Sequence, residues 1–112
     1  MPIEEKTLKS LAAQSIVTDF QLDEADESLA GRTDLDLDRL RKMLISEVDY
    51  LVTHNMERLK SILYRIDVDE QKLHQALSEG LPSEAPEIIV DMIIEREMQK
   101  AETREKYRRG EL

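Results

Sequence analysis

An eleven-residue repeat in the middle of the chain constrains its fold more than any other feature. Apolar residues recur at this spacing in two complete rows, which are Leu37, Val48 and Leu59 and then Leu40, Leu51 and Ile62. Eleven residues over three helical turns correspond to about 3.67 residues per turn, close to a straight α-helix and above the roughly 3.5 of a left-handed coiled coil. The repeat therefore predicts a long central helix over residues 37–66, packed against shorter helices of the same domain.

A third row of the repeat, formed by Leu44, Asn55 and Ile66, is interrupted by its polar member. Asn55 follows Thr53 and His54, and all three residue types are poor helix formers. Two interpretations are open: Asn55 fixes the register or marks a bend in the helix, or the three polar side chains face a pocket. A helix that breaks here into two packed halves would favour the second interpretation.

The composition indicates an all-α protein of one domain. A chain of 112 residues is long enough to bury about two-thirds of its unfolded surface. Three glycines, three prolines and no tryptophan leave little material for turns or for aromatic pairs between strands. No cysteine is present, which excludes disulfides, thiolate zinc sites and cysteine nucleophiles.

Capping signals predict a short helix directly after the central one. Asp67 is the predicted N-cap, because Glu70 follows it three residues later as in a capping box. Apolar residues at helical spacing continue as far as Gly80, a typical helix terminator. We expect this helix over residues 68–79.

A final helix is predicted over residues 84–108, with Ser83 as its N-cap. Residues 88–94 are apolar on all sides except at Asp91, which indicates a buried segment. The sequence after Met98 consists mostly of Lys, Arg and Glu. This C-terminal helix should therefore begin in the core and project beyond it, completing a small bundle of about four helices.

The N-terminal third differs from the rest of the chain in charge. The net charge is −9, and residues 1–38 hold ten acids and three bases, which gives −7. We expect a first helix over residues 3–17 followed by an acidic linker, so that residues 1–36 are loosely attached to a bundle domain of residues 37–112. The acidity disfavours contact with nucleic acid and with anionic membranes.

Signals for membranes and cofactors are missing from the sequence. No segment has the roughly twenty consecutive apolar residues of a membrane span, and the first residues do not resemble a signal peptide. No glycine-rich phosphate loop occurs either. We expect a cytoplasmic protein that has no cofactor and does not contact a membrane.

Three acids of the final helix form a row that could hold a divalent metal. Glu87, Asp91 and Glu95 are spaced four residues apart and share one helix face. Asp91 would be a buried carboxylate in need of a partner, such as Arg65 or His54. A metal-dependent helical hydrolase using the three acids with His54 is one alternative, although acid rows on helices are more often solvated.

The one positive patch lies in the C-terminal tail. It contains six bases, which are Arg96, Lys100, Arg104, Lys106, Arg108 and Arg109. Tyr107 lies among them, so weak nucleic-acid binding through stacking and phosphate contacts is a second alternative. Interleaved acids suit ion pairs on a solvated helix instead.

These patterns assign no residue to catalysis, cofactor binding or a complete metal site. Asn55 and Asp91 are the positions singled out for a structural or functional role, and the six tail bases for an interaction. The favoured interpretation is a non-enzymatic interaction or regulatory protein whose helix faces recognise a protein partner or a second copy of the chain. The partner itself is not identified by the sequence.

Overall fold

The computed structural model describes residues 4–20 and 37–110. These residues form five α-helices and one 3₁₀ turn, with no strand among them: α1 (Glu5–Phe20), α3 (Leu37–His54), α4 (Met56–Ile66), α5 (Glu70–Glu79), the turn Pro82–Glu84 and α6 (Ala85–Arg108). The predicted all-α bundle is confirmed. Most of the predicted acidic linker, residues 21–36, lies outside the described residues. Within the described ranges no helix carries enough consecutive apolar sequence to cross a bilayer.

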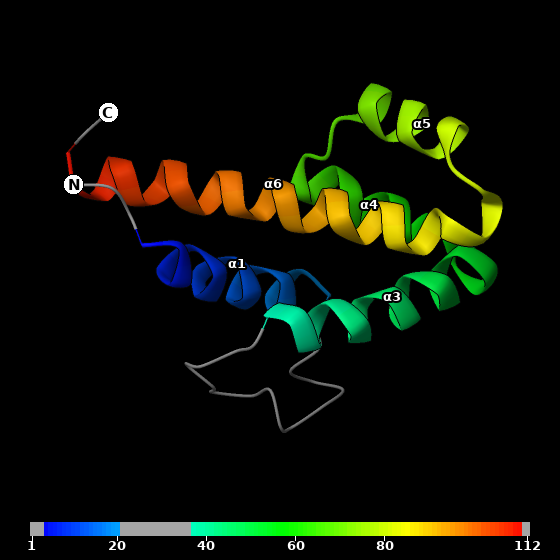
Figure 1. Cartoon of the computed structure of the whole chain (residues 1–112), viewed down its shortest axis with the longest axis horizontal. Coiled ribbons are helices and arrows are strands. Elements are labelled where there is room, and N and C mark those ends of the chain that lie inside the picture. Colours follow the sequence, from blue (N-terminus) through cyan, green and yellow to red (C-terminus); the bar gives the residue numbers. More distant parts are fainter. Residues whose placement is uncertain (1–3, 21–36, 111–112) are drawn as a thin grey trace.

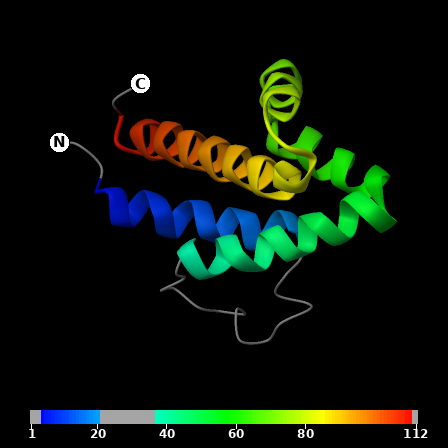
Figure 2. The same ribbon diagram turned by 45° about the vertical axis from the view of Figure 1, so that its right-hand side comes forward.

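The long helix α6 is the element on which the others pack (Figure 1). α1 lies along its C-terminal half, whereas α3 and α4 lie along its N-terminal half. α5 also contacts α6, and the turned view shows that it projects away from the layer formed by the other helices (Figure 2). The bundle is therefore arranged around its C-terminal helix.

The rows of the sequence repeat form the core. Leu44, Val48 and Ile66 are completely buried. The remaining members of the two complete rows are at most 9% exposed, and they are Leu37, Leu40, Leu51, Leu59 and Ile62. α6 contributes Ile89, Val90 and Ile93 to the same cluster. The eleven-residue spacing thus identified the buried face correctly.

The predicted helix over residues 37–66 is two helices, because the chain breaks at Asn55. This residue has φ −153° and ψ 68°, outside the helical region, and its side chain is exposed. Thr53 Oγ1 donates to the carbonyl of Asp49 at 3.1 Å, and His54 Nδ1 lies 3.1 Å from the carbonyl of Tyr50. Such side-chain bonds compete with continuation of the helix.

A new helix starts at the break. Asn55 Oδ1 accepts a hydrogen bond from the backbone N–H of Arg58 at 3.2 Å, so Asn55 is the N-cap of α4. One straight helix of thirty residues would be about 45 Å long, whereas the longest dimension of the fold is 41 Å. The break lets α4 turn back beside α3, and the apolar rows of both helices stay buried.

The first helix is packed more tightly than its charge pattern suggested. It contributes five buried residues, which are Ala12, Ala13, Ile16, Val17 and Phe20. Arg58 Nη2 donates to the carbonyl of Phe20 at 3.4 Å and so satisfies the last turn of α1. The expectation of a loosely attached helix ending near residue 17 was wrong, because its apolar stripe continues to Phe20 and is buried in the same core.

Two predicted caps lie elsewhere. Asp67 ends α4 in the left-handed conformation (φ 67°) instead of starting α5, whose N-cap is Asp69. Asp69 Oδ1 accepts from the N–H groups of Gln71 and Lys72 at 2.9 and 3.0 Å. Ser83 lies inside the 3₁₀ turn and does not cap α6. Both elements nevertheless begin within two residues of the predicted positions.

Candidate functional site

A hollow of about 530 Å³, lined by both charged and apolar side chains, lies between α1 and the C-terminal half of α6; we call it the α1–α6 hollow. On α1 it is lined by Ser15, Thr18 and Asp19, which share a face because they are three or four residues apart. Glu97 and Arg104, two helical turns apart on α6, line the opposite wall. Charged side chains of both signs therefore meet between the two helices.

Glu97 is the most unusual of these residues because it is completely buried. Its Oε1 lies 3.5 Å from Lys100 Nζ, and its Oε2 has no hydrogen-bond partner among the described residues. A buried carboxylate oxygen without a donor is costly in a folded protein. Such an atom lining a hollow is a reason to look for a ligand.

The surroundings of Glu97 favour its neutral form. Burial raises the pKa of the Glu97 carboxyl, and the neighbouring Asp19 carboxyl raises it further. The ammonium group of Lys100 acts in the opposite direction but does not cancel the effect of burial. Glu97 and Asp19 thus form an acid pair at one end of the hollow.

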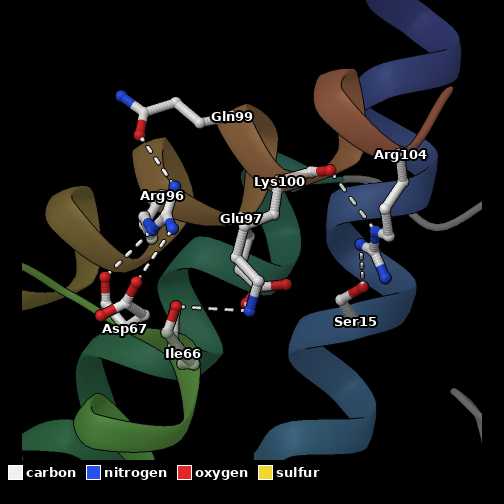
Figure 3. Close-up of polar contacts among 8 residues, drawn as sticks. All are labelled: Ser15, Ile66, Asp67, Arg96, Glu97, Gln99, Lys100 and Arg104. Atoms are coloured by element: carbon white, nitrogen blue, oxygen red, sulfur yellow. Dashed lines mark hydrogen bonds and ion pairs between the residues drawn. The ribbon is translucent and has the colours of Figure 1, made fainter. Parts of the chain in front are cut away.

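Lys100 is held away from the free oxygen of Glu97. Its Nζ donates to the carbonyl of Ile66 at 3.3 Å, at the negative end of the α4 dipole. Figure 3 shows the lysine reaching past Glu97 to this carbonyl. The lysine therefore joins α6 to α4 and satisfies only one side of the carboxylate.

Arg104 lies further along the hollow, beside Ser15. Its Nη2 donates to Ser15 Oγ at 3.0 Å, and its Nε donates to the carbonyl of Lys100 at 3.4 Å (Figure 3). Among the described residues its hydrogen-bond partners are therefore neutral oxygens. A guanidinium normally takes a carboxylate or phosphate in a bidentate contact, so this group retains the capacity to bind an anion.

A second hollow, of about 580 Å³, lies between α4 and α5; we call it the α4–α5 hollow. Leu63, Val68 and Leu73 give it an apolar lining, and Tyr64 beside them is 85% exposed. Acids gather at its edge, namely Asp67, Asp69 and Glu70, with Lys60 as the one base in its lining. No residue of α5 is fully buried, so the apolar side of this helix remains partly open.

The sequence pointed to Asp91 as the buried carboxylate, and this was wrong. Its side chain is 57% exposed and makes a bidentate contact with Arg41, with Nε–Oδ1 at 2.8 Å and Nη2–Oδ2 at 3.2 Å. None of the predicted partners is used. The buried acid is Glu97, which continues the spacing of Val90 and Ile93 towards Ala101, and this pattern could have identified it.

The predicted metal row is not assembled into a site. Glu87, Asp91, Glu95 and His54 are all exposed, and Asp91 is already paired. The described part of the chain contains no group of three or more His, Asp or Glu residues that could hold a metal ion. The hydrolase alternative therefore lacks the arrangement on which it depended.

The interruption of the repeat at Asn55 is a bend, as one of the two interpretations predicted. The break into packed halves is the arrangement that was expected to favour a pocket. Thr53, His54 and Asn55 are nevertheless exposed and line neither of the two hollows. The ring of His54 stacks on Tyr50 with centroids 4.4 Å apart.

The tail bases make contacts within the chain. Arg96 donates to the Asp67 carbonyl at 3.0 Å and to its carboxylate at 3.1 Å. Lys106 pairs with an acid of its own helix, Glu102, at 2.9 Å. Arg108 and Arg109 both pair with Glu105, and with Lys100 and Arg104 described above all six bases have partners. The patch is consequently less positive than its sequence suggests.

Comparisons with known protein families, with curated proteins and with solved structures gave no match to this chain.

Proposed function

We propose that this protein is an interaction module whose α4–α5 hollow receives the C-terminal end of α6 from a second copy of the chain. The observation that carries the proposal is the exposure of Tyr64 beside a hollow lined by Leu63, Val68 and Leu73. An aromatic side chain next to an open apolar hollow is typical of protein interfaces. The proposal is of the same class as the function expected from the sequence.

Charge complementarity selects the occupant. The edge of the α4–α5 hollow is acidic, so a basic segment with an apolar or aromatic anchor should fit it. The end of α6 has this character: Tyr107 is 76% exposed and lies between Lys106 and Arg108. Although these bases pair with acids of their own helix, residues 100–110 hold five bases and two acids, so the segment keeps a net positive charge. The two surfaces belong to one chain and differ from each other, so their contact joins one copy to the next.

Sedimentation velocity over a range of concentrations tests the proposal. We expect wild-type protein to associate reversibly, and both Tyr64→Ser and Tyr107→Ser to remain monomeric. Tyr50→Ser is the matched control, because Tyr50 is 56% exposed on α3 and lies outside the hollow. A monomeric mass for the wild type at every concentration would contradict the proposal.

Mixing the two monomeric variants distinguishes binding of the α6 end in the α4–α5 hollow from other kinds of association. Tyr64→Ser retains a normal α6 end, and Tyr107→Ser retains a normal hollow. An equimolar mixture should therefore form a 1:1 complex that neither variant forms alone, and the complex should weaken with salt. No complex in the mixture would show that the two surfaces do not bind each other.

A further inference from the structure

The α1–α6 hollow contains charged groups whose hydrogen-bonding capacity is left unused by the part of the chain that the structure describes. Glu97 Oε2 is completely buried and has no partner among the described residues, and Asp19 lies beside it. Further along the hollow, the hydrogen bonds that Arg104 makes to described residues go to the neutral oxygens of Ser15 and Lys100. Lys100, Glu105 and Arg108 also line the hollow, but Lys100 donates to the Ile66 carbonyl and Glu105 pairs with Arg108. The groups left for a ligand are therefore the carboxyls of Asp19 and Glu97 and the guanidinium of Arg104.

Helix geometry sets the separation of the acid pair and the Arg104 guanidinium. Ser15, which accepts from the Arg104 guanidinium, is four residues before Asp19 on α1, and four residues rise about 6 Å. Arg104 bends back toward the carbonyl of Lys100, one turn earlier on α6, which brings its charge closer to Glu97. The acid pair and the guanidinium are therefore separated by a distance that one small molecule can bridge.

A ligand that pairs with both the acid pair and the Arg104 guanidinium carries one positive and one negative group. An ammonium ion donates three hydrogen bonds and could serve both Asp19 and Glu97, whereas a carboxylate matches the fork of Arg104. We propose that the α1–α6 hollow binds a free amino acid as its zwitterion, with the ammonium group at Asp19 and Glu97 and the carboxylate at Arg104.

The rest of the hollow indicates the kind of side chain. Leu11 and Ala101 provide its apolar lining, and the volume of about 530 Å³ lies within the range of small-molecule pockets. An aliphatic amino acid such as valine or leucine fits this lining. Burial raises the pKa of the Glu97 carboxyl even though Lys100 Nζ lies 3.5 Å from Oε1, which agrees with a carboxyl whose other oxygen has no hydrogen-bonded cation among the described residues.

Thermal unfolding and isothermal titration calorimetry with defined probes test the proposal. We expect L-valine and L-leucine to raise the melting temperature and to bind with measurable heat, because they bind the folded state. N-acetyl-valine lacks the ammonium group and valine amide lacks the carboxylate, so neither should bind. Binding of putrescine or inorganic phosphate without binding of the amino acids would overturn the proposal in favour of a simple cation or anion site.

Three variants locate the binding. Arg104→Gln and Glu97→Gln should each weaken binding by about tenfold or more, since each removes a hydrogen bond to a charged group. Arg39→Gln is the matched control, because Arg39 is an exposed arginine of α3 outside the hollow. Each variant is compared with its own unliganded melting temperature, which separates binding from stability. Unchanged affinity in Arg104→Gln, or no binding of either amino acid to the wild type, would refute the proposal.

Discussion

The break at Asn55 can be tested through the sign of a stability change. Asn55→Leu restores the third apolar row of the sequence repeat between Leu44 and Ile66. If residues 37–66 formed one straight helix, the new leucine would be buried and would add about 1.5–3 kcal/mol to the free energy of unfolding. In the structure position 55 is exposed, so this gain is absent.

The structure predicts a loss instead. Both Asn55→Leu and Asn55→Ala remove the hydrogen bond from Arg58 N–H to Asn55 Oδ1, which is 3.2 Å long. Loss of an N-cap costs about 1 kcal/mol of the free energy of unfolding. In a domain of this size that loss corresponds to a fall of about 4 °C in the melting temperature.

Urea unfolding followed by circular dichroism measures the free energy of unfolding of each variant. The slope of this free energy against urea concentration should be the same for all variants, which shows that the folded state is unchanged. Asn55→Asp is the control, because an aspartate oxygen can accept the same hydrogen bond and should leave stability close to that of the wild type. A variant Asn55→Leu that is more stable than the wild type would refute the break and restore the continuous helix.

Three further predictions concern the core and the ion pairs. Burial raises the pKa of the Glu97 carboxyl in the folded state, so its bound proton stabilises the fold. This stabilisation is complete below the unfolded pKa of about 4.3 and is lost as pH rises through the folded pKa. The free energy of unfolding, measured with urea at a series of pH values, should show this decline in the wild type and lack it in Glu97→Gln. Leu44→Ala should lower the free energy of unfolding by about 2–5 kcal/mol, whereas Met43→Ala, at a position that is 36% exposed, should change it little. Arg41→Gln should have only a small effect, which vanishes at about 1 M salt, because the Arg41–Asp91 pair is exposed to solvent. The first prediction would be contradicted if the decline with pH persisted in Glu97→Gln. The second would be contradicted if Leu44→Ala and Met43→Ala lowered the free energy of unfolding equally, and the third if Arg41→Gln caused a large loss that salt did not change.

The sequence predicted the buried face of the middle segment well, because burial requires only that apolar residues recur at helical spacing. Leu44 and Ile66 are both completely buried on either side of the break. The break itself involves contacts between side chains and nearby backbone groups: Thr53 Oγ1 donates to the Asp49 carbonyl, His54 Nδ1 lies beside the Tyr50 carbonyl, and Asn55 Oδ1 accepts from the Arg58 N–H. Periodicity contains no information on these bonds, so the same pattern was compatible with one helix or two.

The candidate hollows were harder to predict because they form between helices that are distant in the sequence. Ser15 and Arg104 are 89 residues apart, and nothing in either segment indicates the other. The acidity of the N-terminal third also led to the prediction of a loosely attached first helix, although the buried apolar residues of α1 continue to Phe20 and hold the helix in the core. Asp91 was singled out because it lies in the apolar run of residues 88–94, whereas Glu97, which lies on the buried face, was not considered.

The contacts that α6 makes with the end of α4 have a consequence for any shortened form of the chain. Arg96 and Lys100 hold the carbonyls of Asp67 and Ile66, so they close the last turn of α4 from outside. A protease or an expression boundary that removed everything after Glu95 would expose that turn and also uncover the buried side of α1. A truncated protein would then lose binding because it unfolds, and only substitutions within the intact chain can separate recognition from stability.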